Sequence, residues 1–250
     1  MKLAPTIKYN VQDIITKTIP IYYGFFIFIF LLLFVLSKIP SMHMNGSFSG
    51  ISMNSSVLLI IIGLIFTRPS FWFLTQMGVS HKTQIAAKII GIIFICAVVV
   101  AVDRLVDLAS AYLYKSSDIT YESSEIFTMP FSDTLSNLQP FARELTVIGL
   151  AFSSRVMIFA AAVFVAMLYV RMNTFTKVIV SVGVPLLAIF VLPLSIKFFP
   201  EQMERIFNNL GEITGLSDGQ PIKLILCMMG SAVVSFVLLY LLTRRAPIND

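Results

Sequence analysis

The segment "IYYGFFIFIFLLLFVL" at residues 21–36 decides the class of fold. It contains no charged side chain, and Pro20 and Lys38 flank it. A charge-free apolar run that approaches the roughly 20 residues needed to cross the hydrocarbon core of a bilayer is typical of a transmembrane helix. We therefore expect this run to be retained as the first membrane anchor rather than removed as a signal peptide.

The composition of the whole chain extends this interpretation. Of the 250 residues, 57% are hydrophobic and only 12% are charged, and the mean hydropathy is +0.89. These values exclude an ordinary soluble domain. We predict an all-α, polytopic membrane protein that forms a single transmembrane domain over residues 1–250. The six transmembrane helices are expected at residues 20–38, 51–67, 85–112, 145–170, 177–198 and 223–243.

The distribution of lysine and arginine predicts the orientation in the membrane. An even number of helices places both termini on one side, together with the loops at 67–88 and 171–177. That side holds ten Lys and Arg residues, and the opposite side holds six. Because basic loops tend to stay inside, we expect both termini to be cytoplasmic. The net charge of +5 then indicates contact with anionic membrane lipid rather than with nucleic acid.

Two segments have the periodicity of surface helices. Residues 6–18 carry apolar side chains on one face, which indicates an interfacial helix in the inner headgroup layer; a disordered tail is the alternative. In the predicted extracellular segment 200–222, "PEQMERIFNNLGEITGL" aligns apolar residues on one face before Gly215 ends the helix. That helix would gate an exit or serve as a structural cap. A second extracellular segment is expected at residues 113–144.

Few catalytic arrangements fit this sequence. It has no GxxxxGK[ST] loop for nucleotide phosphates, so the chain is not expected to hydrolyse ATP itself. His43 and His81 fall on opposite predicted sides of the membrane, while Cys96 and Cys227 lie inside predicted helices. We therefore expect no metal site, no disulfide, no cofactor on this chain and no enzymatic activity of its own.

Charged residues inside two predicted helices carry more information. The sequence "VDRLVD" places Asp103 and Asp107 on one face of the third helix, next to Arg104, and "FSSRVM" places Arg155 inside the fourth. Counted from the cytoplasmic ends, Asp103 and Arg155 both lie roughly 22 to 24 Å from the inner face. Because an arginine at this depth normally has a partner, we predict an ion pair between them. The alternatives are solvated charges beyond the headgroups, a proton relay, or a substrate-binding pair.

The loop at 68–84 is too apolar for a solvated linker, yet it also carries side chains that need polar partners. Gly78 permits a turn, and Ser80 can cap the helix that follows. This mixture indicates a short cytoplasmic helix that docks into another protein; an interfacial or re-entrant helix without a partner is the alternative. The residues assigned to the contact are Arg68, Phe71, Trp72, Phe73, Gln76, Gly78, Ser80 and Lys82.

Four features together resemble the permease subunit of an ABC-2-type exporter. They are the loop "FWFLTQMGVSHKTQIAAK" at 71–88, the amphipathic start, the six predicted helices and the ending "LLTRRAP" at 241–247. The likeness is to the small Gram-positive branch that includes phenol-soluble modulin and lantibiotic-type peptide exporters. It covers the whole chain in layout and is specific in the loop and the tail. His81 departs from the pattern, because arginine would be expected there.

The resemblance implies that the loop at 68–84 is a coupling helix seated in a cleft of a separate cytoplasmic ABC ATPase. Phe71, Phe73 and Gln76 would contact that ATPase, and the chain would turn back into the membrane between Gly78 and Lys82. Two permeases, either identical copies or paralogues, would pair with two ATPases, which would bind ATP and Mg. The expected location is the plasma membrane of a bacterium.

The resemblance also favours amphipathic, antimicrobial or toxin-like peptides as cargo, with lipid-like or drug molecules as the alternative. Phe and Met would offer adaptable contacts to such cargo, although lipid-facing and packing positions use the same residues. Two other classes remain open. One is an ion-driven secondary transporter with Asp103, Asp107 and Arg155 as its relay, and the other is an immunity or sensor protein that does not transport.

Overall fold

The computed structural model describes residues 3–37, 47–49, 51–114, 120–122 and 127–244, which are almost entirely helical. The helices are α1 (Leu3–Asp13), α2 (Ile19–Ser37), α3 (Ile51–Gln76), α4 (His81–Tyr114), α5 (Ser132–Ser136), α6 (Pro140–Arg171), α7 (Thr174–Leu186), α8 (Leu192–Phe198), α9 (Pro200–Thr214) and α10 (Pro221–Arg244). The shorter elements are π-helical segments at Ile14–Thr18 and Leu187–Val191, a 3-10 turn at Met129–Phe131, and the strands β1 (Ser47–Ser49) and β2 (Thr120–Glu122).

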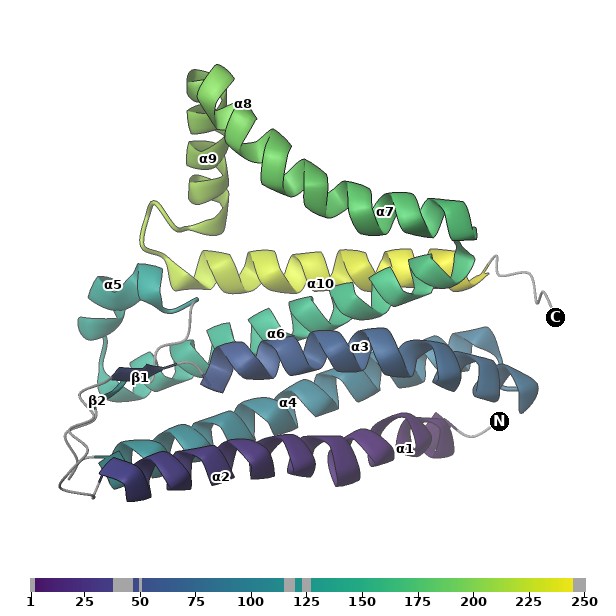
Figure 1. The fold of residues 1–250 in the computed structure, drawn as a ribbon, viewed down its shortest axis with the longest axis horizontal. Coiled ribbons are helices and arrows are strands. Elements are labelled where there is room, and N and C mark those ends of the chain that lie inside the picture. Colours follow the sequence, from purple (N-terminus) through teal and green to yellow (C-terminus); the bar gives the residue numbers. More distant parts are fainter. Residues whose placement is uncertain (1–2, 38–46, 50, 115–119, 123–126, 245–250) are drawn as a thin grey trace.

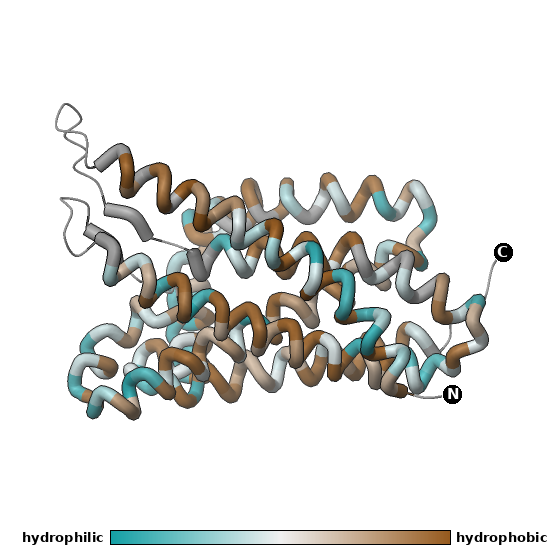
Figure 2. Tube along the Cα trace, turned by 90° about the horizontal axis from the view of Figure 1, so that it is seen from below, coloured by the Kyte–Doolittle hydropathy of each residue, from teal (hydrophilic) through white to brown (hydrophobic). Residues whose placement is uncertain are grey.

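Three of the described helices are long and apolar enough to cross a membrane. They are His81–Tyr112 in α4, Pro140–Arg171 in α6 and Pro221–Thr243 in α10. Shorter apolar stretches occupy Asn54–Ile65, Thr174–Gly183 and Ile189–Phe198. Apolar residues predominate along the long helices in Figure 2. The fold is therefore that of a helical membrane protein, while the count of six spans stays a prediction from the sequence.

Helix α6 lies at the centre of the bundle, where it packs against α3, α4 and α10 (Figure 1). Small side chains permit this packing. A Cβ atom built on Gly63 of α3 would lie 2.7 Å from the Cβ atom of Ala162 in α6, so the two backbones approach closely. In a membrane, where lipid removes the hydrophobic drive between helices, such close approach supplies the dispersion energy that holds helices together.

The N-terminal residues form one continuous helical run, which differs from the predicted division into an interfacial helix and a first span. α1, the π-helical segment and α2 follow one another without a break, and Figure 1 shows α1 and α2 in line along the bundle. The N–H of Ile19 donates to the carbonyl oxygen of Ile14, five residues earlier. This widened turn lies directly before Pro20, which has no N–H to continue the regular pattern.

The apolar face predicted for residues 6–18 packs against protein in the structure. Val11 and Ile14 are buried in the core with residues of α4. The contact is close, because the Cγ2 atom of Val11 lies 3.1 Å from the position of a Cβ atom on Gly91. Burial against α4 therefore explains why Val11 and Ile14 are apolar, while the position of α1 in the headgroup layer stays a prediction.

Helix α3 continues beyond residue 67, where the sequence analysis ends the second span. It includes Pro69 and runs to Gln76, and α4 already begins at His81. The segment 68–84 is therefore the end of α3, a tight turn and the start of α4, rather than a separate short helix. Leu74 and Val79 are buried, so apolar packing extends as far as the turn.

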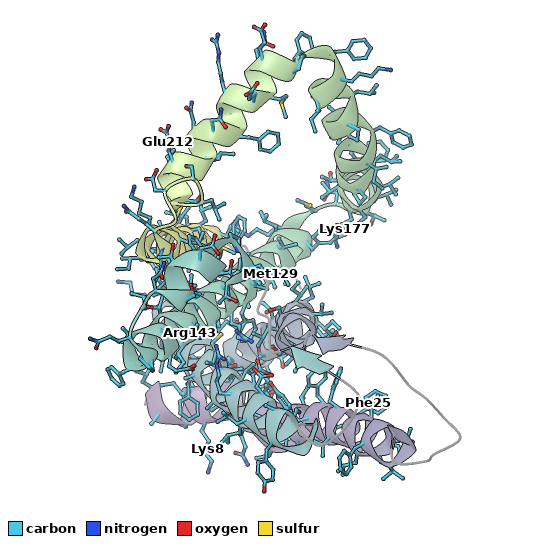
Figure 3. The ribbon with its side chains drawn as sticks, turned by 90° about the vertical axis from the view of Figure 1, so that its left-hand side faces the viewer. Lys8, Phe25, Met129, Arg143, Lys177 and Glu212 are labelled. Carbon is cyan, nitrogen blue, oxygen red and sulfur yellow. The ribbon has the colours of Figure 1, made fainter. Side chains whose placement is uncertain are left out.

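Helices α7, α8 and α9 form an arm that stands away from the bundle, with Lys177 and Glu212 on its two limbs (Figure 3). The π-helical segment lies between Pro185 in α7 and Pro193 in the first turn of α8, so the irregular backbone falls where the prolines predict it. α9 ends at Gly215, whose φ of 74° favours glycine, as the sequence predicts.

The two ends of the helical bundle carry different elements. α1 begins and α10 finishes at one end, which also carries the α3–α4 turn (Figure 1). At the other end β1 and β2 pair in parallel, and Phe131 and Leu135 are buried beside α6 and α10. The hydroxyl of Thr134 in α5 donates to the carbonyl oxygen of Gly219 at 3.0 Å. Residues 115–119 and 123–126 of the predicted extracellular segment 113–144 lie outside the described residues.

We predict that Gly63→Val will lower the melting temperature of the purified protein in detergent, because a branched side chain would push α3 away from α6. Overpacking of this kind costs about 1–3 kcal/mol. Gly230→Val is the matched control, since nothing lies within 4 Å of a Cβ atom at that position. Equal losses in the two variants would contradict a stabilising role for the close approach.

Candidate functional site

Arg155 lies on α6 in the interior of the bundle, where its side chain is only 1% exposed. Its Nη2 atom donates to the Oδ2 atom of Asp103 on α4 at 2.6 Å, which forms an ion pair. Its Nη1 atom donates to the carbonyl oxygen of Ala151, one turn earlier on α6, at 2.9 Å. The predicted contact between Asp103 and Arg155 is therefore confirmed, and the alternative of solvated charges does not apply.

Asp103 accepts hydrogen bonds from two further helices. The hydroxyl of Ser55 on α3 donates to Oδ2 at 2.7 Å, and the hydroxyl of Tyr23 on α2 donates to Oδ1 at 2.5 Å. We call Tyr23, Ser55, Asp103 and Arg155 the Asp103 cluster. Every member lies on a different helix and all four side chains are buried. The cluster therefore joins α2, α3, α4 and α6 through one carboxylate.

Tyr23 and Ser55 were not predicted from the sequence as members of this site. The available signal was a hydroxyl-bearing residue inside an apolar helix, but serine and tyrosine occur there for several reasons. Asp107 lies one turn beyond Asp103 and is also buried, whereas Arg104 is half-buried. Neither belongs to the hydrogen bonds that define the cluster.

The second candidate region is the turn between α3 and α4. Gly78 has a φ of 70°, and its N–H donates to the carbonyl oxygen of Thr75. The Ser80 hydroxyl accepts from the Thr83 N–H at 3.4 Å, so Ser80 occupies the predicted capping position at the start of α4. The turn is thus short and fixed at both sides by hydrogen bonds.

The turn presents a mixed surface. Phe73 is 39% exposed, and its ring stacks on Tyr9 of α1 with 4.7 Å between centroids. Gln76, Ser80 and Lys82 are also exposed. Arg68, Phe71 and Trp72 belong to α3, but their side chains lie outside the described residues. The predicted contact residues that the structure describes therefore gather around one turn at the end of the bundle.

The two regions lie toward opposite ends of α4. His81 begins the helix at the turn, and Asp103 follows 22 residues later, which corresponds to roughly 33 Å along the axis. The turn joins α3 and α4 at one end, and the Ser55–Asp103 hydrogen bond joins the same two helices toward the other. This arrangement makes α3 and α4 a hairpin that is closed at both ends.

Metal-binding chemistry finds no support in the described part of the chain, which contains no group of three His, Cys, Asp or Glu side chains able to hold an ion. Cys96 is buried and Cys227 is exposed, and both are free thiols. The chemistry that the described side chains offer is ion pairing, hydrogen bonding and apolar contact.

Comparison with known proteins does not extend the assignment, because no protein-family model, no curated protein and no solved structure matches this chain. The fold and the site define the general class of protein to which the chain belongs. It is a helical membrane protein with a buried charge cluster in its core.

We predict that Arg155→Leu will lower the melting temperature in detergent strongly, because it leaves the buried carboxylate of Asp103 without its cation. Breaking one partner of a buried ion pair costs about 3–5 kcal/mol. Adding Asp103→Asn to that variant should restore part of the loss, since it removes the orphaned charge.

The exposed pair of Lys223 and Asp218 supplies the control for that experiment. Its side chains are both 41% exposed, so Lys223→Leu should cost at most about 1 kcal/mol. If the losses from Arg155→Leu and Asp103→Asn simply add, the two residues do not interact in the folded protein.

Proposed function

We propose that this chain is the permease subunit of an ATP-driven ABC-2-type exporter, with six spans and a separate cytoplasmic ATPase as its partner. The observation that carries the proposal is the α3–α4 turn, which presents aromatic, amide and basic side chains together at the end of a hairpin. Interfaces that bind specifically combine an aromatic anchor with surrounding polar contacts. Phe73, Gln76 and Lys82 supply that combination.

The position of the turn supports its proposed role. It lies at the same end of the bundle as the start of α1 and the end of α10 (Figure 1), and the sequence places most Lys and Arg residues on that side. With the positive side inside the cell, the turn faces the cytoplasm of a bacterium, where an ATPase that binds ATP and Mg is accessible.

The hairpin offers a mechanical link between the ATPase and the core. Closure of the ATPase on ATP would push the turn, and α3 and α4 would move together because the Ser55–Asp103 hydrogen bond joins them far from the turn. Arg155 and Tyr23 would pass this displacement to α6 and α2. Two permeases would line the pathway, and each would couple to one ATPase.

Amphipathic or toxin-like peptides are the proposed cargo. Helix α9 is the last helix of the arm and carries an exposed apolar face that includes Phe207, Leu210 and Ile213. Such a face matches a peptide with an apolar side, and it also matches the outer lipid leaflet. Lipid-like or drug molecules remain the alternative cargo.

An ion-driven transporter is the second candidate, and the burial of Asp103 is the observation that favours it. A carboxylate inside the bundle is the kind of group that carries protons or ions across membranes. Gentle extraction from native membranes, followed by mass spectrometry, separates the two candidates. A copurifying chain of similar abundance with a GxxxxGK[ST] motif supports the exporter, whereas recovery of the chain alone in several mild detergents supports the ion-driven transporter.

We predict that Phe73→Asp will abolish copurification of the ATPase while the protein still inserts into the membrane. A charge in the centre of an apolar contact commonly costs more than 2 kcal/mol of binding energy. Phe175→Asp is the matched control, because Phe175 is 77% exposed at the start of α7 and lies outside the proposed contact. Unchanged association in Phe73→Asp would contradict the role of the turn.

The proposed orientation also predicts which single cysteines can be labelled in intact cells. The experiment uses a background in which Cys96 and Cys227 are replaced by alanine. A membrane-impermeant maleimide should react with Asn209→Cys, because Asn209 is exposed on α9 at the predicted outer side. Ser80→Cys should react only after the membrane is permeabilised. Rapid labelling of Ser80→Cys in intact cells would reverse the proposed topology.

A further inference from the structure

A small pocket lies where α1, α3, α4 and α6 meet, separate from the Asp103 cluster and from the exposed turn. Its volume is about 40 Å³, which corresponds to roughly three water molecules at 10–15 Å³ each. A space of this size admits a single phosphate or carboxylate group and excludes a nucleotide or a folded peptide. Its polar lining residues are Asn10, Thr67, Ser70 and Lys88.

Lys88 brings a cation to this pocket without an acidic partner. Its Nζ atom donates to the carbonyl oxygen of Thr67 at 3.0 Å. An ammonium group has three donors, so this bond leaves capacity for more. Across the ranges that the structure describes, no carboxylate forms an ion pair with Lys88. A counter-ion lowers the free-energy cost of holding a charge among apolar side chains.

Asn10 adds a second unmet donor. Its Nδ2 atom is buried and has no hydrogen-bond partner among the described residues. One acceptor nearby is occupied, because the Thr67 carbonyl oxygen already accepts from both Lys88 and Ser70. The Thr67 hydroxyl donates its proton to the carbonyl oxygen of Gly63, so only its lone pairs face further donors. The pocket therefore holds donors on Lys88 and Asn10 that the hydrogen bonds of the described residues do not use, beside the hydroxyl and amide oxygens of its lining.

We propose that this pocket binds one oxyanion group of the phosphate class, held by the Lys88 ammonium and the Asn10 amide. The proposal does not depend on the exporter function, since it follows from the unmet donors alone. The oxyanion can come from a lipid headgroup or from free phosphate. Lys88 lies seven residues into α4, or roughly 10 Å from its start, which is within reach of the phosphate layer of one leaflet.

The test uses the purified full-length protein in a neutral detergent and follows its melting temperature during titration. Three probes are compared: phosphatidylglycerol in mixed micelles, inorganic phosphate, and diacylglycerol, which has acyl chains but no phosphate. A ligand that binds only the folded protein raises the melting temperature as its concentration passes the Kd. We expect stabilisation by phosphatidylglycerol or by inorganic phosphate, and none by diacylglycerol.

The two phosphate probes identify the source of the oxyanion. Stabilisation by phosphatidylglycerol at concentrations where inorganic phosphate has no effect assigns the pocket to a lipid headgroup. Stabilisation by both at similar concentrations assigns it to a free anion. Failure of both probes to stabilise the protein overturns the proposal, because water alone would then satisfy the donors.

Variants show whether the effect belongs to this pocket. Lys88→Met should weaken binding of the effective probe at least tenfold, because it removes the cation but keeps a side chain of similar length. Lys8→Met is the matched control, since Lys8 is exposed on α1 and carries the same charge. Equal affinity in the two variants would overturn the proposal.

A second variant keeps the test decisive if Lys88→Met does not fold. Asn10→Asp introduces a carboxylate into the same pocket, where it can pair with the Lys88 ammonium and repel an incoming anion. We expect this variant to fold and to lose the stabilisation by the effective probe. Unchanged binding in Asn10→Asp would show that the anion binds elsewhere.

Discussion

The structure depends on one constraint, which is the need to neutralise an arginine inside an apolar bundle. Arg155 is held by Asp103 at 2.6 Å, and the same carboxylate also accepts from Ser55 and Tyr23. A buried ion pair stabilises a fold only when its remaining hydrogen-bonding capacity is filled. Here four helices must keep their relative positions for the Asp103 carboxylate to accept from these three donors. The cluster therefore fixes the register of α2, α3, α4 and α6, although apolar contacts supply most of the buried area.

The same constraint connects the core with the surface. Because Ser55 and Asp103 lie far from the α3–α4 turn, the two helices are joined at both ends. The Asp103 cluster links this hairpin in turn to α2 and α6. The arm from α7 to α9 is joined to α6 by a hydrogen bond between the hydroxyls of Tyr169 and Ser181 at 2.7 Å, and α9 also contacts α10.

Both parts of the site were only partly predictable. The sequence indicated Asp103 and Arg155, because charges inside apolar helices at matching depth need partners. It did not indicate Tyr23, whose hydroxyl becomes informative only when α2 is placed beside α4. The sequence also indicated the turn through Gly78 and Ser80, since a positive φ and a helix cap have local chemical signatures. The predicted end of α3 at residue 67 was too early, because α3 runs to Gln76. Leu74 is buried there by residues of other elements, and the local sequence does not reveal such tertiary contacts.

The sequence by itself determined that this is a helical membrane protein, where its longest apolar runs lie, and which buried charges require partners. These properties follow from local composition and from the cost of charge in hydrocarbon. Only the tertiary structure decided that the amphipathic face of residues 6–18 packs on α4, that α3 reaches Gln76, and that Lys88 and Asn10 line one pocket. An apolar face looks the same in sequence whether lipid or protein covers it, so only the packed helices distinguish the two.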